Sequence, residues 1–135
     1  MKNKIIIGSR GSKLALIYAE RAKREVLKKH KIESVEIKTI TTTGDTIKDV
    51  RLSEYGGKGL FCKTIEQELL DKKIDIAVHA LKDLPTEETK GLLTNCFLER
   101  NNPRDILITK DNKNIKELKL NAVIGTSSFR REYQI

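Results

Sequence analysis

Cationic and hydroxyl side chains stand beside glycines or strand ends in four short segments of the chain. The segments are GSRGS at residues 8–12, GGKG at 56–59, HALKDLP at 79–85 and GTSSFRR at 125–131. The first and last run into helical patterns, where free backbone N–H groups and the positive end of the helix dipole favour an anion. Plain helix capping explains each segment singly as well. Together, the four segments predict one cleft that binds carboxylates or phosphates.

An acid and a base stand side by side in the third of these segments. Lys82 and Asp83 lie between an apolar stretch and Pro85. Such a pair at a strand end can hold charge in a partly desolvated site, so Asp83 is the candidate catalytic residue. The alternative is a turn aspartate that bonds its own backbone before the proline. His79 is expected to be a buried strand-end residue rather than a base.

The charge balance indicates an anionic partner. The chain has 27 Lys and Arg against 19 Asp and Glu, a formal net charge of +8. The basic residues at 21–31 predict a solvated helix face, with nucleic-acid contact as the alternative. The three Tyr and three Phe are scattered instead of interleaved with basic residues, which argues against nucleic acid. Neither GxxxxGK[ST] nor GxGxxG is present, so nucleotide binding is set aside.

Cysteine usage and hydropathy indicate the cellular compartment of the protein. Cys62 and Cys96 form no CxxC and have no histidine pair nearby, so we expect reduced thiols and neither a metal site nor a disulfide. No apolar run approaches the roughly 18 residues that cross a bilayer. The start MKNKIIIG reaches Gly8 and Arg10 too soon for a signal-peptide core. These features predict a cytoplasmic protein without a membrane partner.

The hydrophobic periodicity predicts the elements that must position these side chains. A length of 135 residues allows one domain or pieces of two. We expect buried strands at 4–8 (the central one), 35–40 and 75–79, helices from Leu14 to near His30 and over 60–70, and a long functional loop at 41–59. The alternation is βαβ-like, which predicts an α/β fold with parallel strands and ligands at their carboxyl ends.

A second, unfinished unit is predicted after residue 98. Residues 92–98 are a further strand candidate, and the polar segment 99–105, ERNNPRD, is expected to cross to the next unit. That unit would open with strands at 106–109 and 123–125. A helix should follow, capped by Thr126 or Ser127. The predicted organisation is therefore residues 1–98, a crossover at 99–105 and an incomplete unit at 106–135.

The motifs of this chain resemble those of one enzyme family. IIIGSRGSKLAL, TTTGD, GGKGLFCKTIEQELL, DIAVHALKDLPT, ERNNPRD and VIGTSSFRREYQ occur in the order and at the spacing found in porphobilinogen deaminases, also called hydroxymethylbilane synthases. The resemblance implies a transferase of tetrapyrrole (haem) biosynthesis, a monomer when full length. Such an enzyme joins four porphobilinogen molecules head to tail into hydroxymethylbilane, releases ammonia at each step, and uses a covalent dipyrromethane primer.

The resemblance also implies a fold and an extent. The family has three domains, the first two with the mixed, largely parallel sheet of type II periplasmic-binding proteins. This chain would hold most of domain 1 and the truncated start of a similar domain 2. The third domain, whose Gly-Gly-Cys segment anchors the cofactor, would be absent. Neither Cys62 nor Cys96 takes that role, and the isolated chain is expected to be inactive and poorly stable.

The resemblance also implies which residues form the site, because each of them occupies a position of a matched family motif. Asp83 matches the catalytic aspartate, which stabilises the cationic azafulvene-like species left when ammonia departs. Phe61 matches a phenylalanine near the pyrrole rings. The residues that would bind cofactor or substrate carboxylates are Arg10, Ser12, Lys58, Lys82, Thr126, Ser127, Ser128, Arg130 and Arg131. The competing hypothesis is a non-enzymatic module of periplasmic-binding-protein type that holds a small carboxylate.

Overall fold

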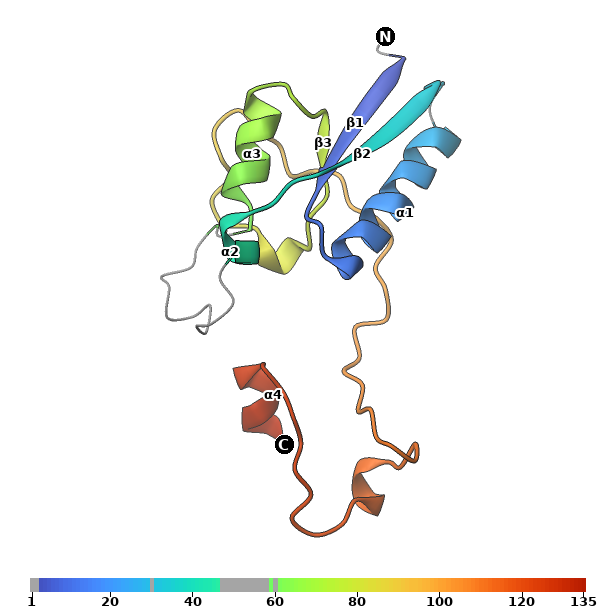
Figure 1. Ribbon diagram of the computed structural model, residues 1–135, viewed down its shortest axis with the longest axis vertical. Helices are drawn as coiled ribbons and strands as arrows, with labels where there is room; N and C mark the ends of the chain where they lie inside the picture. The colour runs from blue at the N-terminus through green and yellow to red at the C-terminus, as the bar shows by residue number, and fades with distance from the viewer. Residues whose placement is uncertain (1–2, 30, 47–58, 60) are drawn as a thin grey trace. The chain divides into compact units, whose positions relative to one another are not determined.

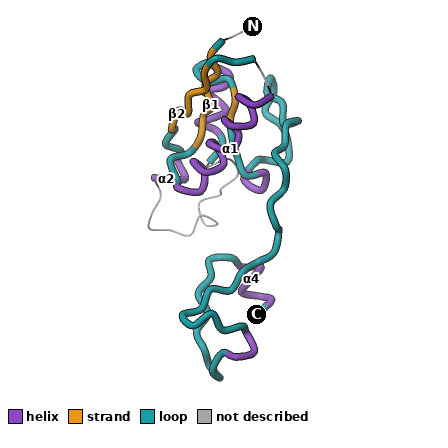
Figure 2. The backbone as a smooth tube through the Cα atoms, turned by 90° about the vertical axis from the view of Figure 1, so that its right-hand side faces the viewer, coloured by secondary structure: helices purple, strands orange, loops and turns teal. Residues whose placement is uncertain are grey.

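The chain forms two compact units, Met1–Leu98 and Glu99–Ile135. The computed structural model describes residues 3–29, 31–46, 59 and 61–135, and Figure 1 shows the path of the chain through both units. Within these ranges, no helix is long and apolar enough to cross a membrane. Nearly all of the regular secondary structure belongs to the first unit, whereas the second unit is mostly loop (Figure 2).

A three-stranded parallel sheet forms the centre of the first unit. Its strands are β1 (Lys4–Ser9), β2 (Ser34–Thr39) and β3 (Ile76–Ala77), in the order β2-β1-β3. Lys4 pairs with Ser34 at one end of the sheet, and Ile7 pairs with Ile76 on the other side of β1. The predictions of an α/β fold, of parallel pairing and of a central first strand are therefore confirmed.

Two helices cover opposite faces of this sheet (Figure 1). Helix α1 (Lys13–Lys29) packs on the face that receives Ile7, and helix α3 (Lys63–Leu70) packs on the face that receives Ile6. Successive side chains of a strand point to opposite faces, so a strand covered on both sides must be apolar at every position. This geometry explains why the first strand is the continuous run KIIIG instead of an alternating pattern.

Several boundaries in the first unit differ from the sequence prediction. Residues Thr43–Thr46 form a helical turn, α2, within the segment predicted to be loop; residues 47–58 of that segment, and residue 60 of the helix predicted after it, lie outside the described residues. Helix α3 begins at Lys63 instead of residue 60. The strand predicted at 75–79 is reduced to β3, and just before it the Asp75 carboxylate, rather than a backbone carbonyl, accepts the N–H of Ile6 at 2.9 Å.

The strand predicted at residues 92–98 is wrong. The segment forms no ladder in the described part of the chain, and only its last residue, Leu98, packs against the core beside α1. A strand exists through the hydrogen bonds that it shares with a neighbour. Apolar composition alone therefore could not make these residues a strand.

The second unit contains a 3-10 turn, η3 (Ile115–Glu117), and one short helix, α4 (Phe129–Gln134). The strands predicted at 106–109 and 123–125 are wrong: neither segment forms a β-ladder with any described residue, and Val123 is 98% exposed. The predicted cap is also shifted. Ser128 is the N-cap, because its hydroxyl accepts the N–H of Arg131 at 3.4 Å, whereas the Thr126 hydroxyl accepts the N–H of Ser128 at 3.1 Å.

Candidate functional site

Arg10, a largely buried arginine, directly follows the end of β1. The Arg10 guanidinium donates from Nε (3.0 Å) and Nη2 (2.5 Å) to Oδ1 of Asp45, which lies on α2. The other carboxylate oxygen of Asp45 accepts the backbone N–H (3.1 Å) and the hydroxyl (2.7 Å) of Thr42. Both charged side chains are about one-fifth exposed, so their pairing is stronger than that of a surface pair.

These contacts determine the ionisation of Asp45. Burial, the largest single influence, raises the pKa of the carboxyl group, but the hydrogen bonds from Arg10 and Thr42 together lower it below its ordinary value. A carboxyl whose pKa is depressed in the folded state stabilises the fold above the unfolded pKa, and this stabilisation is lost as the pH falls through the folded pKa.

We therefore expect Asp45→Asn to weaken the acid sensitivity of the protein. The free energy of unfolding of the unmodified protein should fall as the pH drops below about 4, the range in which an aspartate of the unfolded chain titrates. The variant should be less stable at pH 7 and should lose less stability between pH 5 and pH 3. Urea unfolding at several pH values measures both slopes, and parallel slopes would contradict the assignment.

An aromatic ring lies against the same arginine. The Arg10 guanidinium carbon is 3.8 Å from the centre of the Phe61 ring, within the range of a cation–π contact. Gly44 allows this ring to approach, since a Cβ at that position would lie 2.1 Å from Phe61 Cε1. The arginine is thus fixed by an acid of the TTTGD segment and by the aromatic ring of Phe61, two residues before α3.

Asp83 closes the 3-10 turn η2 (Leu81–Asp83) that follows β3. Its backbone N–H donates to the Ala80 carbonyl at 2.9 Å, and its own carbonyl accepts the Sγ–H of Cys62 at 2.9 Å. Burial, assisted by the charges of Glu66 and Asp83, raises the pKa of the Cys62 thiol to about 11. The thiol therefore stays protonated at neutral pH and remains a donor to the turn that carries Asp83.

His79 lies between β3 and this turn, half-buried. Its Nε2 atom is buried and has no hydrogen-bond partner among the described residues. Burial lowers the pKa of His79 more than the nearby carboxylates of Glu66 and Asp83 raise it. The imidazole is consequently neutral at pH 7, and the negative charge of this region lies on carboxylates.

The structure brings together Arg10, Phe61 and Asp83 of the predicted site. Arg10 and Asp83 both act on the titration of Cys62 and of His79, so all four groups share one region at the carboxyl ends of β1 and β3. Other predicted residues differ in their surroundings. The Ser12 hydroxyl caps α1 by accepting the Ala15 N–H at 3.3 Å, and Lys82 is exposed. Lys58 lies outside the described residues.

The arginines predicted near the end of the chain form a cluster within the second unit. Arg130 Nη2 donates to Asp105 Oδ2 at 2.8 Å, whereas Arg131 contacts Oδ1 through Nε at 2.9 Å and Nη2 at 2.7 Å. Hydrogen bonds from Arg131 and then Arg130 hold the pKa of Asp105 below its ordinary value. Ser127 is exposed, and Thr126 and Ser128 make the cap contacts described above. That this cluster joins Arg10 in one cleft remains a prediction.

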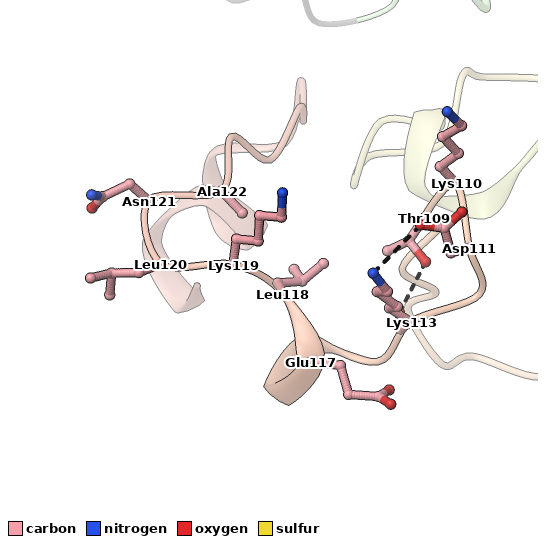
Figure 3. Close-up of a pocket in the computed structure, with 10 residues that line it drawn as sticks. All are labelled: Thr109, Lys110, Asp111, Lys113, Glu117, Leu118, Lys119, Leu120, Asn121 and Ala122. Atoms are coloured by element: carbon pink, nitrogen blue, oxygen red, sulfur yellow. Dashed lines mark hydrogen bonds and ion pairs between the residues drawn. The ribbon is translucent and has the colours of Figure 1, made fainter.

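The second unit also contains a shallow hollow, lined by residues within 109–122 (Figure 3). Its rim is fixed by local contacts: the Thr109 hydroxyl donates to the Lys113 carbonyl at 3.0 Å, and Lys113 pairs with Asp111 at 3.5 Å. No residue of the predicted site lines it. A search of the described ranges finds no group of His, Cys, Asp and Glu suited to a metal ion.

Three acidic residues of these clusters were not predicted as site residues. Asp45 and Asp105 belong to TTTGD and ERNNPRD, segments that were recognised as motifs without a role for their acids. The sequence offered no signal for these roles, because each acid meets a predicted arginine only in the tertiary structure. Glu66, whose carboxylate accepts the Thr89 hydroxyl at 2.8 Å, carries no local signal beyond its place on an amphipathic helix.

Comparison with known proteins gives a consistent result along the whole chain. Residues 5–135 match the family model described as "Porphobilinogen deaminase, dipyromethane cofactor binding domain". The chain is 47% identical over all its 135 residues to porphobilinogen deaminase of Bacillus subtilis (strain 168), and 46% identical over the same length to that of Chlorobium phaeobacteroides (strain BS1). Over 132 residues it is 50% identical to the enzyme of Clostridioides difficile (strain 630). The chain spans 43–44% of the length of these relatives.

Proposed function

Since the chain belongs to the porphobilinogen deaminase family, we propose that the protein containing it is a hydroxymethylbilane synthase. It would join porphobilinogen molecules head to tail and release one ammonia for each molecule joined. The observation that carries this proposal is the cluster at the carboxyl ends of β1 and β3, where an arginine held by an acid and an aromatic ring lies in the same region as Asp83.

The charge of the substrate supports this role for Arg10. Every pyrrole unit carries an acetate and a propionate, so the growing product is polyanionic. Asp45 engages one edge of the Arg10 guanidinium, which leaves its other N–H donors for a ligand carboxylate. Because the Asp45 and Phe61 contacts already fix the guanidinium plane, little side-chain entropy is lost when a carboxylate binds.

The surroundings of the arginine also suit the dipyrromethane cofactor. Arg10 would hold one of its carboxylates, and the Phe61 ring, 3.8 Å from that guanidinium, adds an aromatic side chain beside the bound group. When bound, the cofactor supplies the primer to which porphobilinogen is added. Cys62 does not fit the role of cofactor anchor, because its thiol is fully buried, stays protonated and donates a hydrogen bond to the Asp83 carbonyl.

We assign the proton and charge chemistry to Asp83. Loss of ammonia leaves positive charge on the substrate pyrrole, and a fixed carboxylate beside the pyrrole N–H stabilises it. The Cys62 and Ala80 contacts hold the backbone of Asp83, so the carboxylate is presented from a rigid turn. A rigid turn keeps the reorganisation cost small when charge develops.

The fold proposal follows the family. We propose that the first unit is most of a type II periplasmic-binding-protein-like domain and that residues 106–135 open a similar second domain after a crossover at 99–105. The parallel order β2-β1-β3 with helices on both faces supports this arrangement. Cytoplasmic location and a monomeric state stay predictions.

The test uses the longest natural protein that contains this chain. Its intact mass should exceed the sequence mass by one dipyrromethane, and Ehrlich's reagent should detect the bound pyrroles. With porphobilinogen, it should release one ammonia for each molecule consumed. A protein that binds porphobilinogen without consuming it, and that carries no dipyrromethane, would instead be a carboxylate-binding module of the same fold, and the proposal would fall.

A further inference from the structure

We propose that Asp105 is a positioning residue that holds Arg130 and Arg131 together as a pair for one ligand carboxylate. This inference rests on the proposed function, because it takes the ligand to be a carboxylate of the pyrrole substrate or cofactor. Its basis is the cluster in which a single carboxylate contacts both guanidiniums.

Each oxygen of Asp105 serves one arginine. Oδ2 accepts Nη2 of Arg130, and Oδ1 accepts both Nε and Nη2 of Arg131. Consecutive residues of a helix project about 100° apart, so two neighbouring arginines do not converge on one ligand by helix geometry alone. A carboxylate between them supplies the convergence that the helix lacks.

Both partners of this contact are held in place by their own segments. Arg130 Nη1 donates to the Gln134 side chain at 2.9 Å, one turn further along α4. On the other side, the Asn102 carboxamide oxygen accepts the N–H of Arg104 at 3.1 Å, a turn contact that leads directly into Asp105. The acid therefore belongs to an ordered turn of ERNNPRD, and that turn defines where the two guanidiniums meet.

The contact leaves the pair with capacity for a ligand. Two positive charges face one negative charge, so the cluster keeps an excess positive charge. Arg131 uses its Nε edge on Asp105, which leaves Nη1 unused in this contact, and the Nε of Arg130 is likewise not used on Asp105. The side chains are about half exposed, so these donors are accessible to a ligand. One further carboxylate balances the cluster.

The experiment compares Asp105→Asn and Asp105→Glu in the longest natural protein that contains the chain. Asp111→Asn is the matched control, because Asp111 is an exposed acid of the same unit that pairs with Lys113. Asparagine keeps the shape of the side chain but cannot accept from both arginines, whereas glutamate keeps both acceptors. Circular dichroism confirms folding of each variant.

Two readouts are measured: KM and kcat for porphobilinogen, and the Nε–Hε NMR signal of Arg131 during titration with propionate. We expect Asp105→Asn to raise KM about three- to tenfold, with a smaller change in kcat, because an exposed charge pair contributes modestly to positioning. The Arg131 signal should move in the unliganded variant and respond less to propionate. Asp105→Glu should restore part of both effects, and Asp111→Asn should change neither.

The two readouts separate this inference from the proposed function. If the unmodified protein consumes no porphobilinogen, the proposed function fails, yet the Arg131 signal still reports whether Asp105 orders the pair. An unchanged Arg131 signal in folded Asp105→Asn overturns the inference whatever the activity. A KM shift as large in Asp111→Asn overturns it too, since a general loss of negative charge would then explain the effect.

Discussion

Asp83→Asn is expected to lower kcat for porphobilinogen about 10²- to 10⁴-fold, the usual contribution of a positioned acid or base. The amide keeps the size of the side chain but can neither carry a proton from the pyrrole nor stabilise positive charge on it. KM should change little, because the arginines proposed to bind the substrate carboxylates are untouched. Steady-state kinetics of the longest natural protein that contains this chain would measure both constants.

Two matched variants make the Asp83 result specific. Asp83→Glu keeps the charge on a longer side chain and should retain more activity than the amide. Glu87→Gln removes an exposed acid just beyond the same turn and should leave kcat within about twofold, as a surface substitution does. Unaltered turnover in folded Asp83→Asn would remove the catalytic assignment and favour a binding module.

Ile65→Ala is expected to have the largest effect on stability, lowering the free energy of unfolding by about 2–5 kcal/mol. Ile65 is fully buried and is the one buried residue of α3, where it packs with Ile40 and Ile74. Truncation removes apolar contact and leaves a cavity between α3 and the sheet. Because α3 follows directly on Phe61 and Cys62, the site should loosen as well. Urea unfolding followed by circular dichroism measures the loss.

Two further isoleucine substitutions show whether the loss of stability comes from lost packing or merely from the removal of apolar atoms. Ile65→Val removes one methyl group and should cost about 0.5–1.5 kcal/mol. Ile17→Ala removes the same atoms from a side chain of α1 that is 56% exposed, and it should stay within about 0.5 kcal/mol of the unmodified protein. Equal losses at Ile65 and Ile17 would show that α3 does not pack on the sheet as described.

The first half of the fold could be predicted because its signals are local. A continuous apolar run, KIIIG, and the three- and four-residue spacing of apolar residues in α1 each indicate one structure. The strands predicted at 92–98, 106–109 and 123–125 failed for a different reason. Their composition suits a strand, but a strand also needs a hydrogen-bonding neighbour, and none of the described residues provides one.

Residue types singled out part of the cluster at the carboxyl ends of β1 and β3, but its contacts were not predicted, and the roles of these residues stay a proposal. Arg10, Phe61 and Asp83 follow from motifs, and the structure brings them into one region. Asp45 and Asp105 were missed as partners because each meets its arginine across a long stretch of chain: Arg10 to Asp45, and Arg130 to Asp105. Spacing within a motif carries no information about such a pairing.

The sheet order has a consequence for how the protein folds. β1 pairs with β2 across a single helix, whereas its pairing with β3 joins Ile7 to Ile76 across most of the first unit. Closing a long loop costs more entropy and lowers the folding rate, so the β1–α1–β2 segment should form early and β3 should add late. The turn that carries Asp83 follows β3 directly. A nascent chain would therefore place Arg10 before it places Asp83, the proposed catalytic residue. A ligand that contacts both residues would speed no early folding step, but it would slow unfolding.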